Sequence, residues 1–376
     1  MGLALVASLF SVRWGVSIAL TEILIGVIGG NFLGLKPTPW ITFLGGFGSI
    51  VLTFLAGADI DPGTLRKRWK ESLGIGFISF LAPFLGAMAY AYWVAGWDLP
   101  AAQIAGVALS TTSMAVVYAV MVETGLNETE IGQLILAACF VTDLGTVLAL
   151  GILFANFNAW MAFFVAVSAV IMFAFPFLAP RLFGRWGYQV SQPEIKFILL
   201  RLFVLGGLAS QANSEPVLPA YVLGLVAAGT MLKHPHLMQR MRTITFTALT
   251  PFYFLKAGLF VSLPAVVSGW KIIAALFAVK MLTKILGIYP VTAAFRFGRR
   301  EGIYTTLLMA TGLTFGTISS LFGLTHGIID QAQYTSLVTV VIGSAVVPTL
   351  VAQAYFRPSL SPETQPVTIP QPQSTD

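Results

Sequence analysis

The sequence predicts an all-α protein that crosses a lipid bilayer many times. Hydrophobic residues make up 57% of the 376-residue chain and charged residues only 10%, whereas soluble globular chains carry about 25% charged residues. Mean hydropathy is +0.85. Neither acids nor Lys or Arg occur between Glu71 and Asp98, between Asp98 and Glu123, or between Glu301 and Asp330. Each of these stretches is long enough to cross a hydrocarbon core, which takes about 20 apolar residues.

Hydrophobic runs between polar breaks predict twelve full membrane spans. A partial helix over residues 1–11 precedes them and is too short to cross. The predicted spans are 14–34, 38–57, 72–96, 100–122, 130–155, 157–180, 193–212, 216–232, 243–264, 268–293, 302–323 and 333–356.

Basic residues in the loops predict the orientation, because Lys and Arg concentrate on the cytoplasmic side of helical membrane proteins. One set of alternate loops holds only Lys36 and Lys271. The other set therefore faces the cytoplasm, together with the C-terminus of this multi-pass protein of the cell inner membrane. Its tail, residues 358–376, is rich in Pro, Gln, Ser and Thr and is expected to be disordered. The cytoplasmic set comprises Arg13, Arg66, Lys67, Arg68, Lys70, Arg181, Arg185, Lys233, Arg240, Arg242, Arg296, Arg299, Arg300 and Arg357.

The same composition excludes most other classes of protein. The net charge of +6 comes from cytoplasmic loops and does not indicate nucleic-acid binding. The single cysteine, Cys139, provides neither a disulfide nor a cysteine metal site. We find no pairing of nucleophile and base and no phosphate-binding loop, so neither an enzyme nor a cofactor is expected.

One acid lies deep inside a predicted span. Asp143 has more than ten uncharged residues on either side. A charged group at the bilayer centre costs roughly 2.5–3.5 kcal/mol on insertion scales, so such residues usually bind ions or protons or pair with another charge. Asp143 is therefore our first candidate for an ion-binding residue.

Three lysines also lie deep inside predicted spans. Lys280 and Lys284 are four residues apart and share one helix face, and Lys256 is similarly deep. Any of the three is a candidate charge partner of Asp143, and the sequence leaves the choice open.

Two polar interruptions predict helices that unwind inside the membrane. The first is Ser110-Thr111-Thr112-Ser113 and the second is the run TGLTFGT over residues 311–317, which includes Gly312 and Thr314. Unwound segments in corresponding positions of two halves are the best sequence indication of a transporter binding site. They lie about 200 residues apart, as expected for inverted six-helix repeats at about 1–155 and 193–356, joined by a linker helix near 157–180.

Several segments resemble those of the cation/proton antiporter-2 group of the sodium/proton exchanger superfamily, which contains the NapA-type and Kef-type membrane domains. The resemblance is ordered and covers nearly the whole chain. The similar segments are ALTEILIG (19–26), FLAGADID (54–61), ALSTTSMAVV (108–117), LILAACFVTDLG (134–145), PFYF (251–254) and TKILG (283–287).

This resemblance implies an NhaA/NapA-like antiporter domain over residues 1–357, in which a core domain carries the ion and a panel domain forms a homodimer. Asp143 matches the carboxylate that binds either a proton or a cation, and Lys284 the basic residue facing it. Thr111, Thr112 and Thr314 fall in the unwound crossing segments, and Glu22 in the first similar segment is expected to be structural. The chain departs from the pattern where Thr142 replaces an Asp, and where Thr311-Gly312-Leu313 replaces Arg-Gly-Glu.

The expected activity is exchange of Na⁺ or K⁺ for H⁺ by competition at Asp143. Oxygen atoms of Asp143, of Thr142 and of the unwound backbone suit such hard cations. A single Asp favours one-for-one, electroneutral exchange. Two alternatives remain open: a sodium-coupled symporter of an organic anion, and a non-transporting membrane sensor subunit in which Asp143 forms a fixed ion pair.

Overall fold

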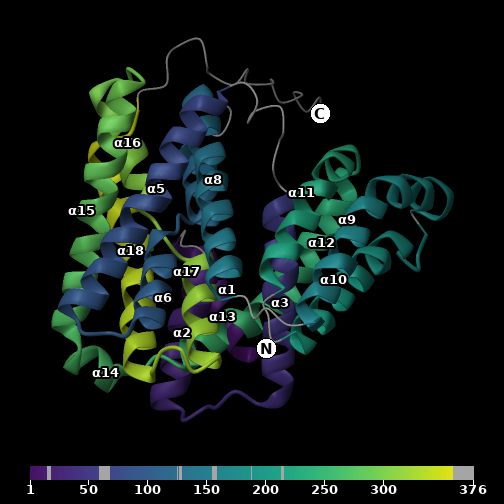
Figure 1. Cartoon of the computed structure of the whole chain (residues 1–376), viewed down its shortest axis with the longest axis horizontal. Coiled ribbons are helices and arrows are strands. Elements are labelled where there is room, and N and C mark those ends of the chain that lie inside the picture. Colours follow the sequence, from purple (N-terminus) through teal and green to yellow (C-terminus); the bar gives the residue numbers. More distant parts are fainter. Residues whose placement is uncertain are drawn as a thin grey trace, which may run out of the picture.

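The structure is a computed structural model that describes residues 1–14, 18–58, 68–124, 126, 129–154, 159–187, 189–212 and 216–358. All regular secondary structure within these ranges is helical (Figure 1). The predicted disorder of the tail concerns residues 359–376, which lie outside the described residues, as do Arg66 and Lys67 of the loop count. The elements are α1 (Gly2–Trp14), α2 (Ile18–Phe32), α3 (Pro39–Ala58), α5 (Trp69–Ala89), the π-helical η1 (Tyr90–Val94), α6 (Leu99–Ser110), α7 (Met114–Thr124), α8 (Glu130–Leu153), α9 (Ala159–Trp186), α10 (Pro193–Gln211), α11 (Val217–Lys233), α12 (Pro235–Ile244), the π-helical η2 (Thr245–Leu249), α13 (Thr250–Leu259), α14 (Leu263–Ser268), α15 (Trp270–Ala294), α16 (Arg299–Met309), α17 (Thr314–Thr325) and α18 (Gln331–Tyr355).

The long apolar helices agree with the predicted membrane spans. Each of the twelve predicted ranges contains helix, and seven helical stretches are long and apolar enough to cross a bilayer. The other ranges hold shorter or more polar helices: α6 stops at an internal break, for example, and α10 carries three charged residues. The seven stretches are Pro39–Ala58, Trp69–Val94, Glu130–Leu153, Trp160–Arg185, Trp270–Ala294, Arg299–Thr325 and Gln331–Tyr355.

The helices fall into two groups that pack mainly among themselves. The broken-helix group consists of α5 to α8 and α15 to α18, and the flanking group consists of α2, α3 and α9 to α13. Figure 1 shows α5, α8, α15, α16 and α18 on one side of the molecule and α9, α10 and α12 on the other. Helix α11 contacts α8 and so helps to join the two groups.

Paired glycines bring helix backbones of the flanking group into close contact. A Cβ atom on Gly258 of α13 would collide with the carbonyl oxygen of Ile23 on α2, and one on Gly26 with the carbonyl oxygen of Leu255. Gly57 of α3 and Gly224 of α11 form an equivalent crossing. Lipid tails are as apolar as leucine, so membrane helices associate through such close van der Waals packing and not through exclusion of water.

Adding a methyl group at this crossing is expected to destabilise the protein. Gly258→Ala places a Cβ against the Ile23 carbonyl, and overpacking of this kind costs about 1–3 kcal/mol. The unfolding temperature of the purified protein in detergent is the measurement. Gly207→Ala on α10 is the matched control, since nothing lies within 4 Å of a Cβ there. Equal unfolding temperatures for the two variants would contradict the packing argument.

Candidate functional site

Two helices of the broken-helix group are interrupted and meet at their interruptions. Helix α6 ends at Ser110 and α7 begins at Met114, while α16 ends at Met309 and α17 begins at Thr314. The Ser113 amide donates a hydrogen bond to the Thr311 carbonyl at 3.1 Å. The Thr112 hydroxyl donates to the Met309 carbonyl at 2.9 Å. Both predicted interruptions are therefore present, over residues 111–113 and 310–313, and they lie against each other. They are shorter than predicted, because Ser110 ends α6 and residues 314–317, including Thr314, already belong to α17.

Hydroxyl groups explain why the chain can stop being helical here. The last carbonyls of a helix have no partner within it, and in a membrane each must find one. The Ser110 hydroxyl donates to the Val107 carbonyl at 2.8 Å, the Thr111 hydroxyl to Ala108 at 3.1 Å, and the Thr311 hydroxyl to Leu308 at 2.8 Å. These side chains satisfy carbonyls next to each break, so a run of Ser and Thr stabilises an interruption that an apolar run would not.

Asp143 lies beside this crossing, in the middle of α8. Its side chain is buried, with 1% of the residue exposed, and its Oδ1 has no hydrogen-bond partner among the described residues. One turn earlier on the same helix, the sulfur of Cys139 lies 3.6 Å from the sulfur of Met309, which is the last residue of α16. Helix α8 therefore carries Asp143 past the point where α16 unwinds.

Lys284 on α15 is held at the first break. In the described part of the chain, no ion pair within 4.0 Å joins it to Asp143. The Lys284 ammonium donates instead to the hydroxyls of Ser79, at 2.8 Å, and of Thr112, at 3.1 Å. The same Thr112 hydroxyl reaches the end of α16, so Lys284 is tied to both broken helices.

Lys280 is held one turn away, at the second break. It is fully buried, and its ammonium donates to the Ser344 hydroxyl of α18 at 2.9 Å. A Cβ built on Gly312 would collide with Lys280 Nζ, which places the ammonium directly against the break between α16 and α17. Lys280 and Lys284 therefore occupy different surroundings although they share a helix face.

The remaining predicted residues lie further from this arrangement or already have hydrogen bonds. Lys256 on α13 and Glu22 on α2 both belong to the flanking group, and both are buried. Neither carboxylate oxygen of Glu22 has a hydrogen-bond partner among the described residues. Thr142 donates its hydroxyl to the carbonyls of Gly76, at 3.2 Å, and Ala138, at 3.1 Å, so it ties α8 to α5. Thr314 is the first residue of α17 and is half-buried.

Sequence reasoning missed Ser79 and Ser344, which hold the two ammonium groups. Each is a single hydroxyl in an otherwise apolar stretch, and single serines in membrane helices usually bond to their own backbone. Only the folded arrangement separates these two from the other serines.

The chemistry assembled at the crossing suits a proton or a hard monovalent cation. It offers a buried carboxylate oxygen, hydroxyl oxygens and backbone carbonyls released from helical bonding, which are the ligands that such cations prefer. Over the described residues, no group of three His, Cys, Asp or Glu side chains could hold a metal ion.

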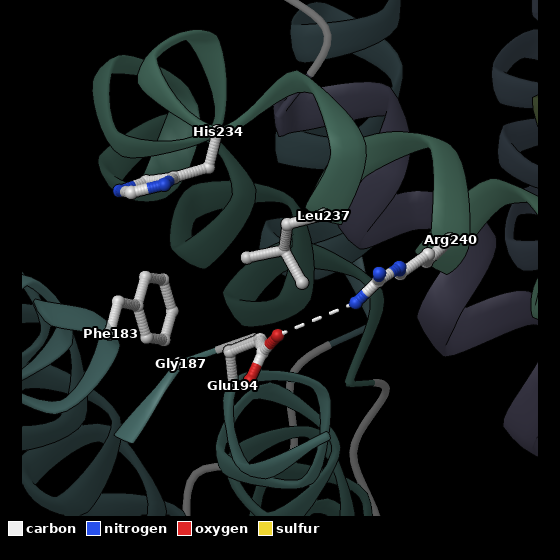
Figure 2. Close-up of a pocket in the computed structure, with 6 residues that line it drawn as sticks. All are labelled: Phe183, Gly187, Glu194, His234, Leu237 and Arg240. Carbon is white, nitrogen blue, oxygen red and sulfur yellow. Dashed lines mark ion pairs between the residues drawn. The ribbon is translucent and has the colours of Figure 1, made fainter. Parts of the chain in front are cut away.

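A small pocket lies away from the crossing, between α9, α10 and the turn from α11 to α12 (Figure 2). Arg240 Nη1 lies 3.8 Å from Glu194 Oε1 and donates to Gln192 Oε1 at 2.9 Å. Phe183 packs edge-on against His234, with ring centroids 5.7 Å apart. This pocket joins helices of the flanking group and contains none of the residues at the crossing.

Comparison with known proteins agrees with this architecture. The chain is similar to Probable Na(+)/H(+) antiporter 3 of Methanocaldococcus jannaschii, with 23% identity over 351 residues that cover 90% of this chain and 89% of the relative. It is similar to the Na(+)/H(+)-K(+) antiporter GerN of Bacillus cereus, with 24% identity over 350 residues that cover 88% of each chain. Its fold resembles that of the sodium proton antiporter MjNhaP1 from Methanocaldococcus jannaschii at pH 8, with a TM-score of 0.68, 12% identity, and coverage of 93% of this chain and 94% of the other.

Residues 1–357 match the family described as sodium/hydrogen exchanger, transmembrane. That range includes both broken helices, Asp143 and the three buried lysines. The chain belongs to the sodium/hydrogen exchanger family of membrane proteins.

Proposed function

We propose that this protein exchanges Na⁺ or K⁺ for H⁺ across the cell membrane by competition at Asp143. The observation that carries the proposal is a buried carboxylate with a free oxygen, held where two broken helices cross. Relatives named as Na⁺/H⁺ and Na⁺/H⁺-K⁺ antiporters support the same activity.

Competition follows from the cost of burying charge. A protonated Asp143 is neutral and tolerates its buried position, whereas an ionised Asp143 requires a cation to offset its charge. Either a proton or a cation therefore accompanies the carboxylate across the membrane. In the proposed site the Thr111 and Thr112 segment and the Gly312 and Thr314 segment provide further oxygen atoms, and Lys284 provides the opposing charge when no cation is bound.

The proposed architecture has twelve spans and two inverted repeats. Its support is that α5, α6–α7 and α8 repeat the order of α15, α16–α17 and α18: a continuous helix, a broken helix and a continuous helix. The broken-helix group would move as the carrier, and the flanking group would stay in place as the dimer-forming panel. The excess of basic residues on one set of loops supports a cytoplasmic C-terminus.

A transport assay in proteoliposomes tests the role of Asp143. External Na⁺ or K⁺ is expected to dissipate an acid load inside vesicles that contain the wild-type protein, and Asp143→Asn should slow this at least about tenfold, because an amide cannot alternate between proton and cation. An internal pH dye reports the rate. Asp98→Asn is the matched control, since Asp98 is exposed and caps α6 with an oxygen that Asn retains. A well-folded wild-type protein that responds to neither cation would refute the antiporter proposal.

The stability of the same variant distinguishes an ion carrier from the alternative of a sensor with a fixed ion pair. Removing one partner of a buried ion pair costs about 3–5 kcal/mol. Asp143 makes no ion pair within the described residues, so Asp143→Asn should leave the unfolding temperature in detergent unchanged or raised. A large drop, with ion flux unaffected, would favour the sensor.

The proposed one-for-one exchange makes transport independent of membrane voltage. With a single carboxylate that binds either ion, one positive charge moves in each direction per cycle. Clamping the membrane potential between about 0 and −100 mV with K⁺ and valinomycin is expected to leave the Na⁺-driven rate unchanged, although moving one net charge would be worth about 2.3 kcal/mol per 100 mV. A several-fold change in rate would show that a second charge is carried.

A further inference from the structure

Lys280 is a buried cation for which the proposed exchange at Asp143 has no use. It is fully buried on α15, and in the described ranges it forms no ion pair with a carboxylate. Lys284 differs, because its hydrogen-bond partners lie on α5 and at the first break. Among the residues that the structure describes, the Lys280 ammonium donates one hydrogen bond, to the Ser344 hydroxyl at 2.9 Å.

The Lys280 ammonium lies near oxygen atoms of the kind that bind a free cation. A Cβ atom built on Gly312 would collide with Nζ and would lie 2.9 Å from the Thr111 hydroxyl and 3.2 Å from the Thr111 carbonyl oxygen. The ammonium and the two Thr111 oxygens therefore lie around the same point beside Gly312. The Ser344 hydroxyl of α18 accepts from Nζ and itself donates to the Gly312 carbonyl at 3.4 Å.

Such a donor set suits a hard monovalent cation. Carbonyl and hydroxyl oxygens are the preferred ligands of such ions, and backbone released from a helix supplies them without a side chain. An ammonium is a compact point charge with three donors, so it can take the place of a bound metal ion.

We propose that the Lys280 ammonium is the permanent occupant of a second monovalent-cation site, formed by Thr111, Gly312 and Ser344. The lysine stem ties this cation to α15, so the site moves with the protein but never releases its ion. A free cation then binds only at Asp143. The statement that a free cation binds only at Asp143 rests on the proposed function. The second site does not, because its own oxygen atoms define it.

Shortening Lys280 should open this site to a free ion. Lys280→Ala removes the ammonium and leaves its oxygen ligands facing the vacated space. Equilibrium binding of radioactive Tl⁺ to the full-length protein in detergent is the measurement. At saturation, Lys280→Ala is expected to bind about twofold more Tl⁺ per chain than wild type, since hydroxyl and carbonyl oxygens alone can hold such a cation.

Lys280→Met is the matched control, because methionine fills much of the same space with an apolar chain. It should bind no more Tl⁺ than wild type. Adding Ser344→Ala to Lys280→Ala should weaken the extra binding, because Ser344 supplies one of the oxygens. If Lys280→Ala binds no more Tl⁺ than Lys280→Met, the proposal is overturned.

Two further measurements keep the outcome clear. Combining Asp143→Asn with Lys280→Ala should remove only the Tl⁺ bound at Asp143 and leave the Tl⁺ bound at the opened second site. The amount of Tl⁺ bound per chain therefore separates failure of the antiport proposal from failure of this one. Where Lys280→Ala is too unstable for binding assays, Lys280→Ser provides the same opening. Added Tl⁺ should raise its unfolding temperature but not that of Lys280→Met, because a ligand that binds only the folded state stabilises it. Equal shifts in the two variants would again overturn the proposal.

Discussion

The demand that every backbone group be satisfied inside a membrane controls the centre of this structure. A helix that breaks in hydrocarbon exposes carbonyl and amide groups, each of which costs several kcal/mol without a partner. Here the two breaks satisfy each other through the bond from the Ser113 amide to the Thr311 carbonyl, while Ser and Thr hydroxyls bond to neighbouring carbonyls. The bond between Ser113 and Thr311 forms only where the two breaks meet, so the two helices are broken at the same depth.

The positions of the buried charges follow from that constraint. The C-terminal end of a helix carries partial negative charge, and α6 and α16 both end at the crossing. An ammonium is favourable at such an end, and the two lysines of α15 lie there: Lys284 against Thr112 and Lys280 against Gly312. Asp143 has the opposite sign, and an oxygen of its carboxylate remains without a hydrogen bond. The lysines are thus bound at the backbone breaks, and in the proposed exchange the carboxylate is left for an ion.

Much of this arrangement could be predicted from the sequence, because membrane helices and their interruptions have strong local signals. Long apolar runs gave the positions of the helices, and four consecutive hydroxyl residues predicted the break after Ser110. The choice between lysines could not be predicted. Lys280 and Lys284 share a helix face at the same spacing, and only Ser79, Thr112 and Ser344 from three other elements tell them apart. The glycine contacts between α2 and α13 were hidden for the same reason, since they depend on which helices meet.

The absence of an ion pair between Asp143 and Lys284 has a physical consequence for transport. A direct pair would hold the carboxylate with a bond that an incoming Na⁺ must break, and in low dielectric such a bond is strong. With Lys284 bound to Ser79 and Thr112 instead, its hydrogen bonds are made elsewhere. In the proposed exchange, a cation would then approach the free Asp143 oxygen without displacing a lysine from its partners. The hydroxyls at the break close the backbone, and under the same proposal they keep the lysine from occupying the ion site.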